Sequence, residues 1–542
     1  MNLNVNKLLV LLPLLLAIAV IFGMFIGSNT TTSQNSYVVE NRFSKINHVL
    51  TYVFEEYVDS IDQKIFWDRS IASILQDLDP HSSYINSEEL GSVNEPLEGN
   101  FEGVGIEFNI IGDTIIVISP ISGGPSKALG IRAGDRIVEI EGSNVAGIGI
   151  KNKEVIRLLR GPEGTIVEVS VLRRGTTAVI DYNITRGKIP INSVDAAYMV
   201  NDSIGYIRVN RFSANTYEEY MDAFSSFPNN EIRALILDLR GNPGGYLSAA
   251  TALVDEFLES DVLIVYTEGK AHPKKPYMST ERGGFKKGDV VVLIDEGSAS
   301  ASEIVAGAVQ DNDRGLIIGR RSFGKGLVQE QFVFPDGSGV RLTIARYYTP
   351  TGRCIQRPYD KGVDSYYGEI YRRIREGDTL ALDSSYFEDS LKFLTPAGKK
   401  VYGGGGIMPD FLVPIDTIEK NAFLNEVLNM GLVSRFAFKY ADGNRDRLKK
   451  YSNVKAFSSE FYFTETDYAD FVQFAESVGV KAGRIEISQS SNLLKTRIKA
   501  YIARHIWGEE GYYRVIHDID NAFQRAVNIL SNTDQFEIKK GS

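Results

Sequence analysis

The chain contains little cysteine and histidine and has fewer positive than negative charges. These shortages limit the disulfides, histidine-based sites and nucleic-acid binding that can be expected of it. Its single cysteine, Cys354, has no internal partner, so neither a disulfide framework nor the redox state of its compartment is encoded. Only five histidines occur among 542 residues. The net charge of −10 argues against a nucleic-acid-binding protein. At this length, with about 150 residues per domain, three or more domains are expected.

Long hydrophobic runs are also scarce, and the clearest lies at the N-terminus. Lys7 precedes an uncharged, mainly apolar stretch over residues 8–26, close to the length that spans a bilayer. No clear small-residue cleavage site follows it. We therefore predict that residues 1–36 are an uncleaved signal anchor with a polar tether, in preference to a cleaved signal peptide, and that the body is exported.

Four further regions follow from changes in periodicity. Residues 37–95 carry apolar side chains at helical spacing and predict an N-terminal helical segment. Residues 96–187 alternate as short strands around glycine-rich turns. Residues 188–415 alternate strands with helices, which indicates crossover connections and a largely parallel sheet. Residues 416–542 have apolar stripes and charged faces, and predict a helical accessory domain of open role.

Two loops of the 188–415 region should meet at one edge of its sheet. Asp238–Gly245 follows a strand expected at 234–239, and Asp295–Ser298 follows one expected at 289–294. Ligands and active sites of such sheets gather at the carboxyl ends of the strands. The two loops are therefore predicted to converge on a catalytic crevice. The remaining strands are expected at 205–210, 315–319 and 339–344.

A serine follows the second loop where a nucleophile would be well placed. Ser300 opens an apolar helix, whose N-terminus offers unpaired N–H groups and the positive end of its dipole. Lys325 follows 25 residues later and would act as its base, a known variant of the serine triad. Its pKa must then fall toward 7–8, through burial and with help from Arg320 and Arg321 if they face the site.

Other interpretations of these residues remain open at this point. Gly319–Lys325 fits most of a phosphate-binding loop, but Gly326 stands where that motif needs Ser or Thr. The serine run is also an ordinary helix cap, and Lys325 an ordinary turn lysine. No histidine lies in either crevice loop, so a serine–histidine–aspartate site is the weaker option. His81 is interpreted as a turn residue.

Seven segments in order resemble the C-terminal processing peptidases, also called tail-specific proteases. The resemblance covers residues 40–415, and the β-rich module within it resembles a PDZ domain. It implies an α/β fold with a mixed or parallel-sheet ClpP/crotonase-like core and an inserted PDZ domain. The segments that carry it are Leu78–Tyr84, the module 96–187, Leu159–Gly164, Asp238–Gly245, Ser298–Ile304, Phe323–Gly326 and Gly403–Asp410.

The resemblance also implies roles for particular residues. Ser300 would be the nucleophile, Lys325 the general base and Gln329 the residue that positions the lysine. Backbone N–H groups of the oxyanion hole would come from Ala301, Gly244 and Gly245. The PDZ domain would bind a substrate's C-terminal carboxylate and add its tail as a strand. Its binding loop would comprise Phe101, Gly103, Val104, Gly105 and Ile106, and Arg160 would link the occupied domain to the protease.

The expected protein is thus a serine endopeptidase without cofactor or metal, acting on proteins with apolar C-termini. It would be anchored in the bacterial cytoplasmic membrane by one N-terminal helix, with its catalytic body on the periplasmic side. The sequence leaves open whether the protein forms a homo-oligomer. A catalytically silent PDZ scaffold of the envelope is the alternative, and intact Ser300, Lys325 and Gln329 argue against it. A chymotrypsin-like PDZ protease is disfavoured because Pro243 stands where its serine belongs.

Overall fold

The computed structural model describes residues 17–24, 44–176, 178–228, 232–376, 389–415, 421–481 and 483–532. The chain divides into two compact units, Met1–Ile74 and Leu75–Ser542. In the first unit, residues 44–56 are helical and α2 (Gln63–Gln76) begins before the boundary. Of the predicted membrane segment, residues 17–24 are helical and the rest lies outside the described residues. Within the described ranges, no helix combines the length and apolarity needed to cross a membrane.

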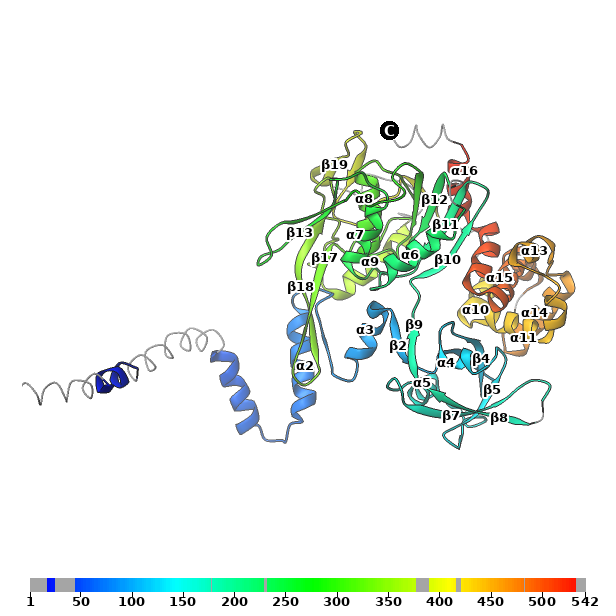
Figure 1. The fold of residues 1–542 in the computed structure, drawn as a ribbon, viewed down its shortest axis with the longest axis horizontal. Coiled ribbons are helices and arrows are strands. Elements are labelled where there is room, and N and C mark those ends of the chain that lie inside the picture. Colours follow the sequence, from blue (N-terminus) through cyan, green and yellow to red (C-terminus); the bar gives the residue numbers. More distant parts are fainter. Residues whose placement is uncertain are drawn as a thin grey trace, which may run out of the picture. The chain divides into compact units, whose positions relative to one another are not determined.

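The predicted PDZ module is a small antiparallel sheet closed by two helices (Figure 1). Its sheet has the strand order β3-β4-β5-β7-β8, and β6 pairs with β5. A separate two-stranded ribbon of β2 and β9 joins the module to the chain on either side. The elements are β2 (Asn100–Gly103), β3 (Ile106–Ile111), β4 (Thr114–Pro120), α4 (Pro125–Ala128), β5 (Arg136–Ile140), β6 (Ser143–Asn144), α5 (Asn152–Leu159), β7 (Ile166–Leu172), β8 (Val179–Thr185) and β9 (Gly187–Pro190).

A six-stranded mixed sheet forms the centre of the catalytic region. Its order is β10-β11-β12-β15-β16-β21, parallel except for β10. The strands β12, β15 and β16 are almost entirely apolar because both faces of the sheet are covered. The predicted parallel strands at 205–210, 234–239, 289–294 and 315–319 are confirmed as β11 (Ile204–Val209), β12 (Ala234–Asp238), β15 (Asp289–Ile294) and β16 (Leu316–Gly319), with β10 (Val194–Met199) and β21 (Phe411–Leu412) at the edges.

Helices from distant parts of the chain cover the two faces of this sheet. One face packs against α6 (Thr216–Ser225), α7 (Leu247–Asp255) and α8 (Ala301–Asp311). The other packs against α16 (Asn521–Leu530), whose Phe523, Ala526 and Ile529 share a core with β11, β12 and β15. The last helix of the predicted accessory region is therefore part of the sheet's own core.

A second, antiparallel sheet stands beside the first, and it corrects one expectation. The strand predicted at 339–344 is β18 (Gly339–Tyr348), but it pairs with β1, β13 and β17 and not with the parallel sheet. The other elements of this part are β1 (Ser83–Ile85), α3 (Leu90–Glu98), β13 (Leu263–Glu268), β14 (Lys275–Met278), β17 (Leu327–Val333), α9 (Val363–Glu376), η2 (Asp389–Leu391), β19 (Lys392–Leu394) and β20 (Lys400–Tyr402).

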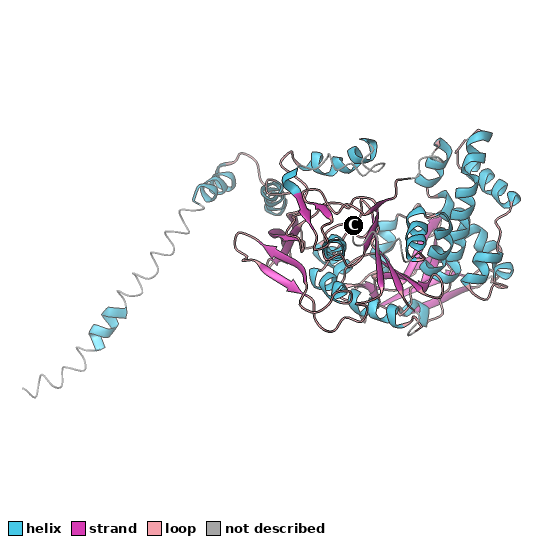
Figure 2. Ribbon diagram, turned by 90° about the horizontal axis from the view of Figure 1, so that it is seen from above, coloured by secondary structure: helices cyan, strands magenta, loops and turns pink. Residues whose placement is uncertain are grey.

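The C-terminal region is helical, as Figure 2 shows by colour. An aromatic-rich segment of this region belongs to the core: Phe457 and Phe461 are fully buried and stack on each other, while Tyr462 is exposed. The helices are α10 (Ala422–Asn429), α11 (Leu432–Gly443), α12 (Arg445–Leu448), α13 (Val454–Glu460), α14 (Glu465–Ser477), α15 (Arg484–Ile516, interrupted at Gly508) and η3 (His517–Ile519), followed by α16.

Candidate active site

Ser300 lies between β15 and α8 in a conformation that few side chains adopt. Its φ of 54° and ψ of −112° turn the chain sharply at the start of α8. The Gly244 backbone lies against it so closely that a Cβ at Gly244 would be 2.8 Å from Ser300 Cβ. Such strain persists only where the surroundings over-determine it, and it gathers at active sites. The two predicted crevice loops therefore do meet at Ser300.

The carboxylate of Glu303 holds Ser300 and Lys325 in one place. Its Oε2 accepts the Ser300 N–H at 2.9 Å and the Lys325 N–H at 2.8 Å. Its Oε1 accepts the Gly324 N–H at 2.7 Å and the Ser322 hydroxyl at 2.5 Å. Glu303 is fully buried, and burial raises its pKa to about 7 although these four donors favour the anion. The buried Glu303 carboxylate thus connects Ser300, at the start of α8, to the loop that contains Lys325.

Tyr347 of β18 makes a second tie between the same two residues. Its hydroxyl oxygen lies 3.0 Å from the Ser300 carbonyl oxygen and 2.6 Å from the Lys325 carbonyl oxygen. Tyr347 is buried, and burial raises the pKa of its phenol. The phenol therefore stays protonated at neutral pH, and its single O–H can donate to either carbonyl oxygen.

The Lys325 side chain is partly buried, and its amine has a neutral hydrogen-bond partner. Its Nζ donates to Gln329 Oε1 at 2.9 Å, and Gln329 Nε2 donates in turn to the His81 carbonyl at 2.6 Å. Burial lowers the pKa of Lys325 from 10.5 to about 8, and the charge of Arg341 adds to the effect. A neutral lysine is thus accessible near physiological pH.

Arg320 and Arg321 do not supply the expected help to Lys325. Arg320 pairs with Glu296 at 2.7 Å, and Arg321 pairs with Glu369 at 3.2 Å. Their charges are therefore neutralised locally, and Arg341 on β18 is the arginine that lowers the pKa of the lysine. His81 lies in a bend, as expected, and touches the site through its carbonyl oxygen.

The predicted oxyanion donors are present but not equivalent. Among the described residues, no acceptor is recorded for the N–H of Ala301 or of Gly245. The Gly244 N–H already donates to Asn242 Oδ1 at 2.8 Å. A Cβ at Gly245 would lie 2.0 Å from the Phe212 carbonyl oxygen, so only glycine fits there. Ala301 and Gly245 are therefore the open donors beside Ser300.

The glycine-rich loop of the β module has the features of an anion-binding turn. Gly105 has a φ of +74°, and a Cβ there would meet Ile189 at 2.9 Å. In the described structure, no acceptor is recorded for the Val104 or Gly105 N–H. Gly103 by contrast has ordinary contacts for a Cβ, and Phe101 and Ile106 belong to β2 and β3. Gly105 is thus the position where the backbone demands glycine.

Arg160, at the end of α5, already bridges the module to the rest of the chain. Its Nη1 lies 2.6 Å from Glu95 Oε2 on α3, and its guanidinium stacks 4.7 Å from the Phe101 ring centroid. The adjacent Asn94 accepts from Arg341 Nη2 at 3.3 Å. Two neighbouring residues of α3 therefore contact the module and the arginine that acts on Lys325, respectively.

Three residues of the site were not identified from the sequence. Glu303 could have been found, since S-x-x-E is the capping-box pattern at a helix start. Tyr347 and Arg341 lie on a strand whose pairing is non-local, and no sequence pattern indicated that they belong to the site. No group of His, Cys, Asp and Glu side chains with metal-binding geometry occurs in the part of the chain that the structure describes.

Comparison with known proteins gives three family matches and several relatives. Residues 203–365 match peptidase family S41, residues 116–173 match the PDZ domain, and residues 423–508 match a family of unknown function, DUF8443. The carboxy-terminal-processing protease of Bartonella bacilliformis is 36% identical over 332 residues, covering 60% of this chain and 75% of the relative. The carboxy-terminal processing protease CtpA of Bacillus subtilis is 30% identical over 435 residues, covering 78% and 91%.

A solved structure is also similar in sequence. The photosystem II D1 C-terminal processing protease is 30% identical, with 57% of this chain and 83% of that chain covered and a TM-score of 0.34.

Proposed function

Because the chain belongs to the carboxy-terminal processing proteases of peptidase family S41, serine-type enzymes with a PDZ domain, we propose that Ser300 and Lys325 form its catalytic dyad. The observation that carries this proposal is the shared anchoring of both residues by Glu303, beside a lysine with a pKa of about 8. Gln329 orients the amine through its side-chain oxygen. The core is of the ClpP/crotonase-like type.

The proposed reaction needs only groups of this chain and water. Neutral Lys325 takes the proton from Ser300 Oγ as that oxygen attacks the scissile carbonyl carbon. The developing oxyanion accepts the N–H groups of Ala301 and Gly245. The lysine then gives its proton to the leaving amine, which departs and leaves an ester on Ser300. A water molecule, deprotonated by the same lysine, hydrolyses that ester and regenerates the serine.

Substrates are proposed to enter by their C-terminal tails. The N–H groups of Val104 and Gly105 would receive the tail carboxylate, and the strand β3 with the helix α5 would flank an apolar tail. Arg160 would link tail binding in the PDZ domain to the protease domain. Its ion pair with Glu95 supports this role. An amidated tail lacks the carboxylate and should bind more weakly than the free acid.

We further propose that the enzyme is anchored in the bacterial cytoplasmic membrane with its body outside the cytoplasm. The support is the uncharged stretch at residues 8–26 after Lys7. A reporter fused after residue 542 should be active only in a form that works outside the cytoplasm. A cytoplasmic signal would refute this orientation.

The dyad is tested by labelling with a fluorophosphonate, which reacts only with an activated serine. Mass spectrometry should locate the adduct on Ser300, and Ser300→Ala should lose both labelling and peptide hydrolysis. Ser298→Ala is the matched control. Ser298 is buried and its hydroxyl donates to the Leu239 carbonyl, so the variant should keep the label. A labelled Ser298, or no label at all, would contradict the dyad, and no label would favour the silent scaffold.

A further inference from the structure

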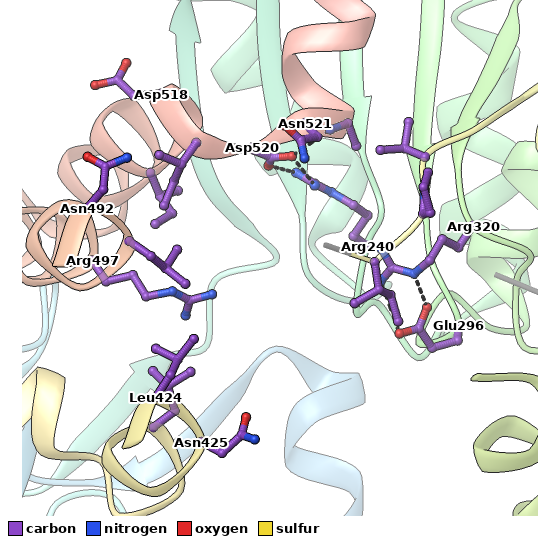
Figure 3. A pocket seen from close by; sticks show the side chains of 18 residues that line it. Arg240, Glu296, Arg320, Leu424, Asn425, Asn492, Arg497, Asp518, Asp520 and Asn521 are labelled. Carbon is purple, nitrogen blue, oxygen red and sulfur yellow. Dashed lines mark hydrogen bonds and ion pairs between the residues drawn. The ribbon is translucent and has the colours of Figure 1, made fainter. Parts of the chain in front are cut away.

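Arg240 occupies an unusual place in the loop that leads to the oxyanion hole. It lies two residues after β12, and its guanidinium reaches Asp520 of the C-terminal region (Figure 3). There its Nη1 donates to Asp520 Oδ1 at 2.9 Å and its Nη2 lies 2.7 Å from Asp520 Oδ2. A bidentate arginine–carboxylate pair of this kind fixes geometry as well as charge. The catalytic loop is therefore tied to a residue 280 positions later.

Asp520 is itself held rigidly on the core. Its Oδ1 caps α16 by accepting the N–H groups of Ala522 and Phe523, both at 3.1 Å. Phe523 packs in the core that covers the central sheet. Burial opposes ionisation of Asp520, but Arg240 keeps the pKa of this carboxyl below its usual range. The carboxylate is thus a charged, fixed anchor at neutral pH.

The Arg240–Asp520 ion pair lies beside a cavity, where little side-chain packing supports it. Arg240 and Asp520 line a cavity of about 700 Å³ between the catalytic loops and the C-terminal helices. The same cavity reaches Glu296 and Arg320 of the second loop, whose own ion pair Figure 3 also shows. Asp238 holds the guanidinium from the other side, through Arg240 Nε at 2.9 Å and Nη2 at 2.6 Å. Asp520 is therefore the partner that fixes the edge of the guanidinium that faces the cavity.

A short run of contacts connects Arg240 to the reacting atoms. Arg208 Nη2 donates to the Arg240 carbonyl at 2.8 Å, and the Gly241 N–H donates to Asp295 Oδ1 at 2.8 Å. The Asn242 carbonyl accepts the Ala299 N–H at 3.0 Å, next to the nucleophile. These contacts place Arg240 in the same hydrogen-bonded loop that presents Gly245 beside Ser300.

We propose that Asp520 is a positioning residue for the oxyanion hole, acting through Arg240 on the loop that presents Gly245. This inference rests on the proposed function, since it assumes that Ser300 is the nucleophile and Gly245 an oxyanion donor. It gives the last part of the C-terminal region a role in the chemical step. Removal of the carboxylate should weaken binding of the transition state more than binding of the substrate.

The test compares Asp520→Asn with Asp518→Asn on a short peptide substrate. Asparagine caps helices as well as aspartate does, so α16 should persist while the charge is lost. Asp518 belongs to the same segment, and its charge acts on Lys499 instead. We expect kcat of Asp520→Asn to fall about tenfold with KM unchanged, because the donors are displaced by a fraction of an ångström. Asp518→Asn should match the wild type.

A second readout separates positioning from stability. A peptide boronate, which forms a tetrahedral adduct on the serine, should bind Asp520→Asn about tenfold more weakly, while the matching product peptide binds unchanged. Asp520→Ser, also a good cap, should behave in the same way. An unchanged kcat, an equal loss of both affinities, or failure of both variants to fold would overturn the proposal.

The two proposals can fail separately. If wild-type Ser300 is not labelled by the fluorophosphonate, the dyad itself is wrong. If Ser300 is labelled and Asp520→Asn keeps its kcat and boronate affinity, only the role of Asp520 is wrong.

Discussion

Two carboxylates on either side of the catalytic loops, Asp238 and Glu303, are equally buried and differ in what surrounds them. Asp238, at the end of β12, accepts two hydrogen bonds from the Arg240 guanidinium and lies 3.1 Å from Arg208 Nη1. Glu303, on α8, accepts hydrogen bonds from three backbone N–H groups and a serine hydroxyl, and no arginine or lysine side chain of the described residues donates to it. Although burial favours the neutral acid at both sites, the two arginines keep the pKa of Asp238 far below its usual range, whereas that of Glu303 rises to about 7.

The difference assigns separate tasks to the two regions. Compensation by fixed arginine charges makes Asp238 insensitive to pH over the physiological range. Compensation by hydrogen bonds leaves Glu303 able to titrate, next to a lysine whose pKa is about 8. We therefore expect loss of the Glu303 carboxylate to alter mainly catalysis, and loss of the Asp238 carboxylate to alter mainly stability.

The largest effect on activity is expected at Lys325. Lys325→Arg keeps the positive charge but cannot act as a base, and turnover should fall about 10²–10⁴-fold. Lys325→Met should be equally inactive and yet more stable at pH 7, by about 1–3 kcal/mol, because the folded enzyme no longer buries an ammonium. Peptide hydrolysis and thermal unfolding measure the two effects. Full activity in Lys325→Arg would eliminate the dyad.

A pair of isosteric substitutions tests the contrast itself. Glu303→Gln replaces an acceptor of four hydrogen bonds by an amide, and should lower kcat about 10²-fold with a modest change in Tm. Asp238→Asn removes the buried carboxylate that Arg208 and Arg240 share, leaving them only their weaker or more exposed partners, and should destabilise the fold by about 3–5 kcal/mol. Hydrolysis assays and thermal unfolding of both variants measure this. The contrast is wrong if Asp238→Asn is the stable, inactive one of the two.

The smallest effect is expected at Arg160, far from the chemistry. Arg160→Ala should lower turnover of folded proteins with apolar tails about 3- to 10-fold and leave short peptides unaffected, because one partly exposed ion pair is lost. Arg157→Ala is the matched control, since Arg157 lies on the same helix and pairs only with Glu154 at the surface. Equal loss with both substrates would remove the proposed link from tail binding to the protease.

Much of the fold was predictable because its signals are local. Strands buried on both faces, such as β12 and β15, are continuous apolar runs, and the loops after them hold the motif residues. What failed was non-local: β18 was expected in the parallel sheet, yet its partners β1, β13 and β17 follow from long-range pairing that no short pattern specifies. The apolar stripe of α16 likewise predicts a helix without identifying the sheet it covers.

The site was likewise predictable where its residues stand in local motifs. Ser300 and Lys325 stand in recognisable motifs, whereas Glu303 resembles an ordinary capping residue until its bond to the Lys325 N–H is seen. Arg341 and not Arg320 acts on the lysine, because nearness in sequence does not determine which charge an ion pair neutralises.

The pH dependence of kcat/KM for a short peptide tests the central claim most directly. Because the pKa of Lys325 is lowered, its neutral fraction grows as pH rises, so kcat/KM should increase up to about pH 8 and level off above it. Below about pH 7, protonation of Glu303 should make the decline steeper. A profile that is already flat at pH 6, or that falls as pH rises from 6 to 8, would contradict a lysine base at Lys325.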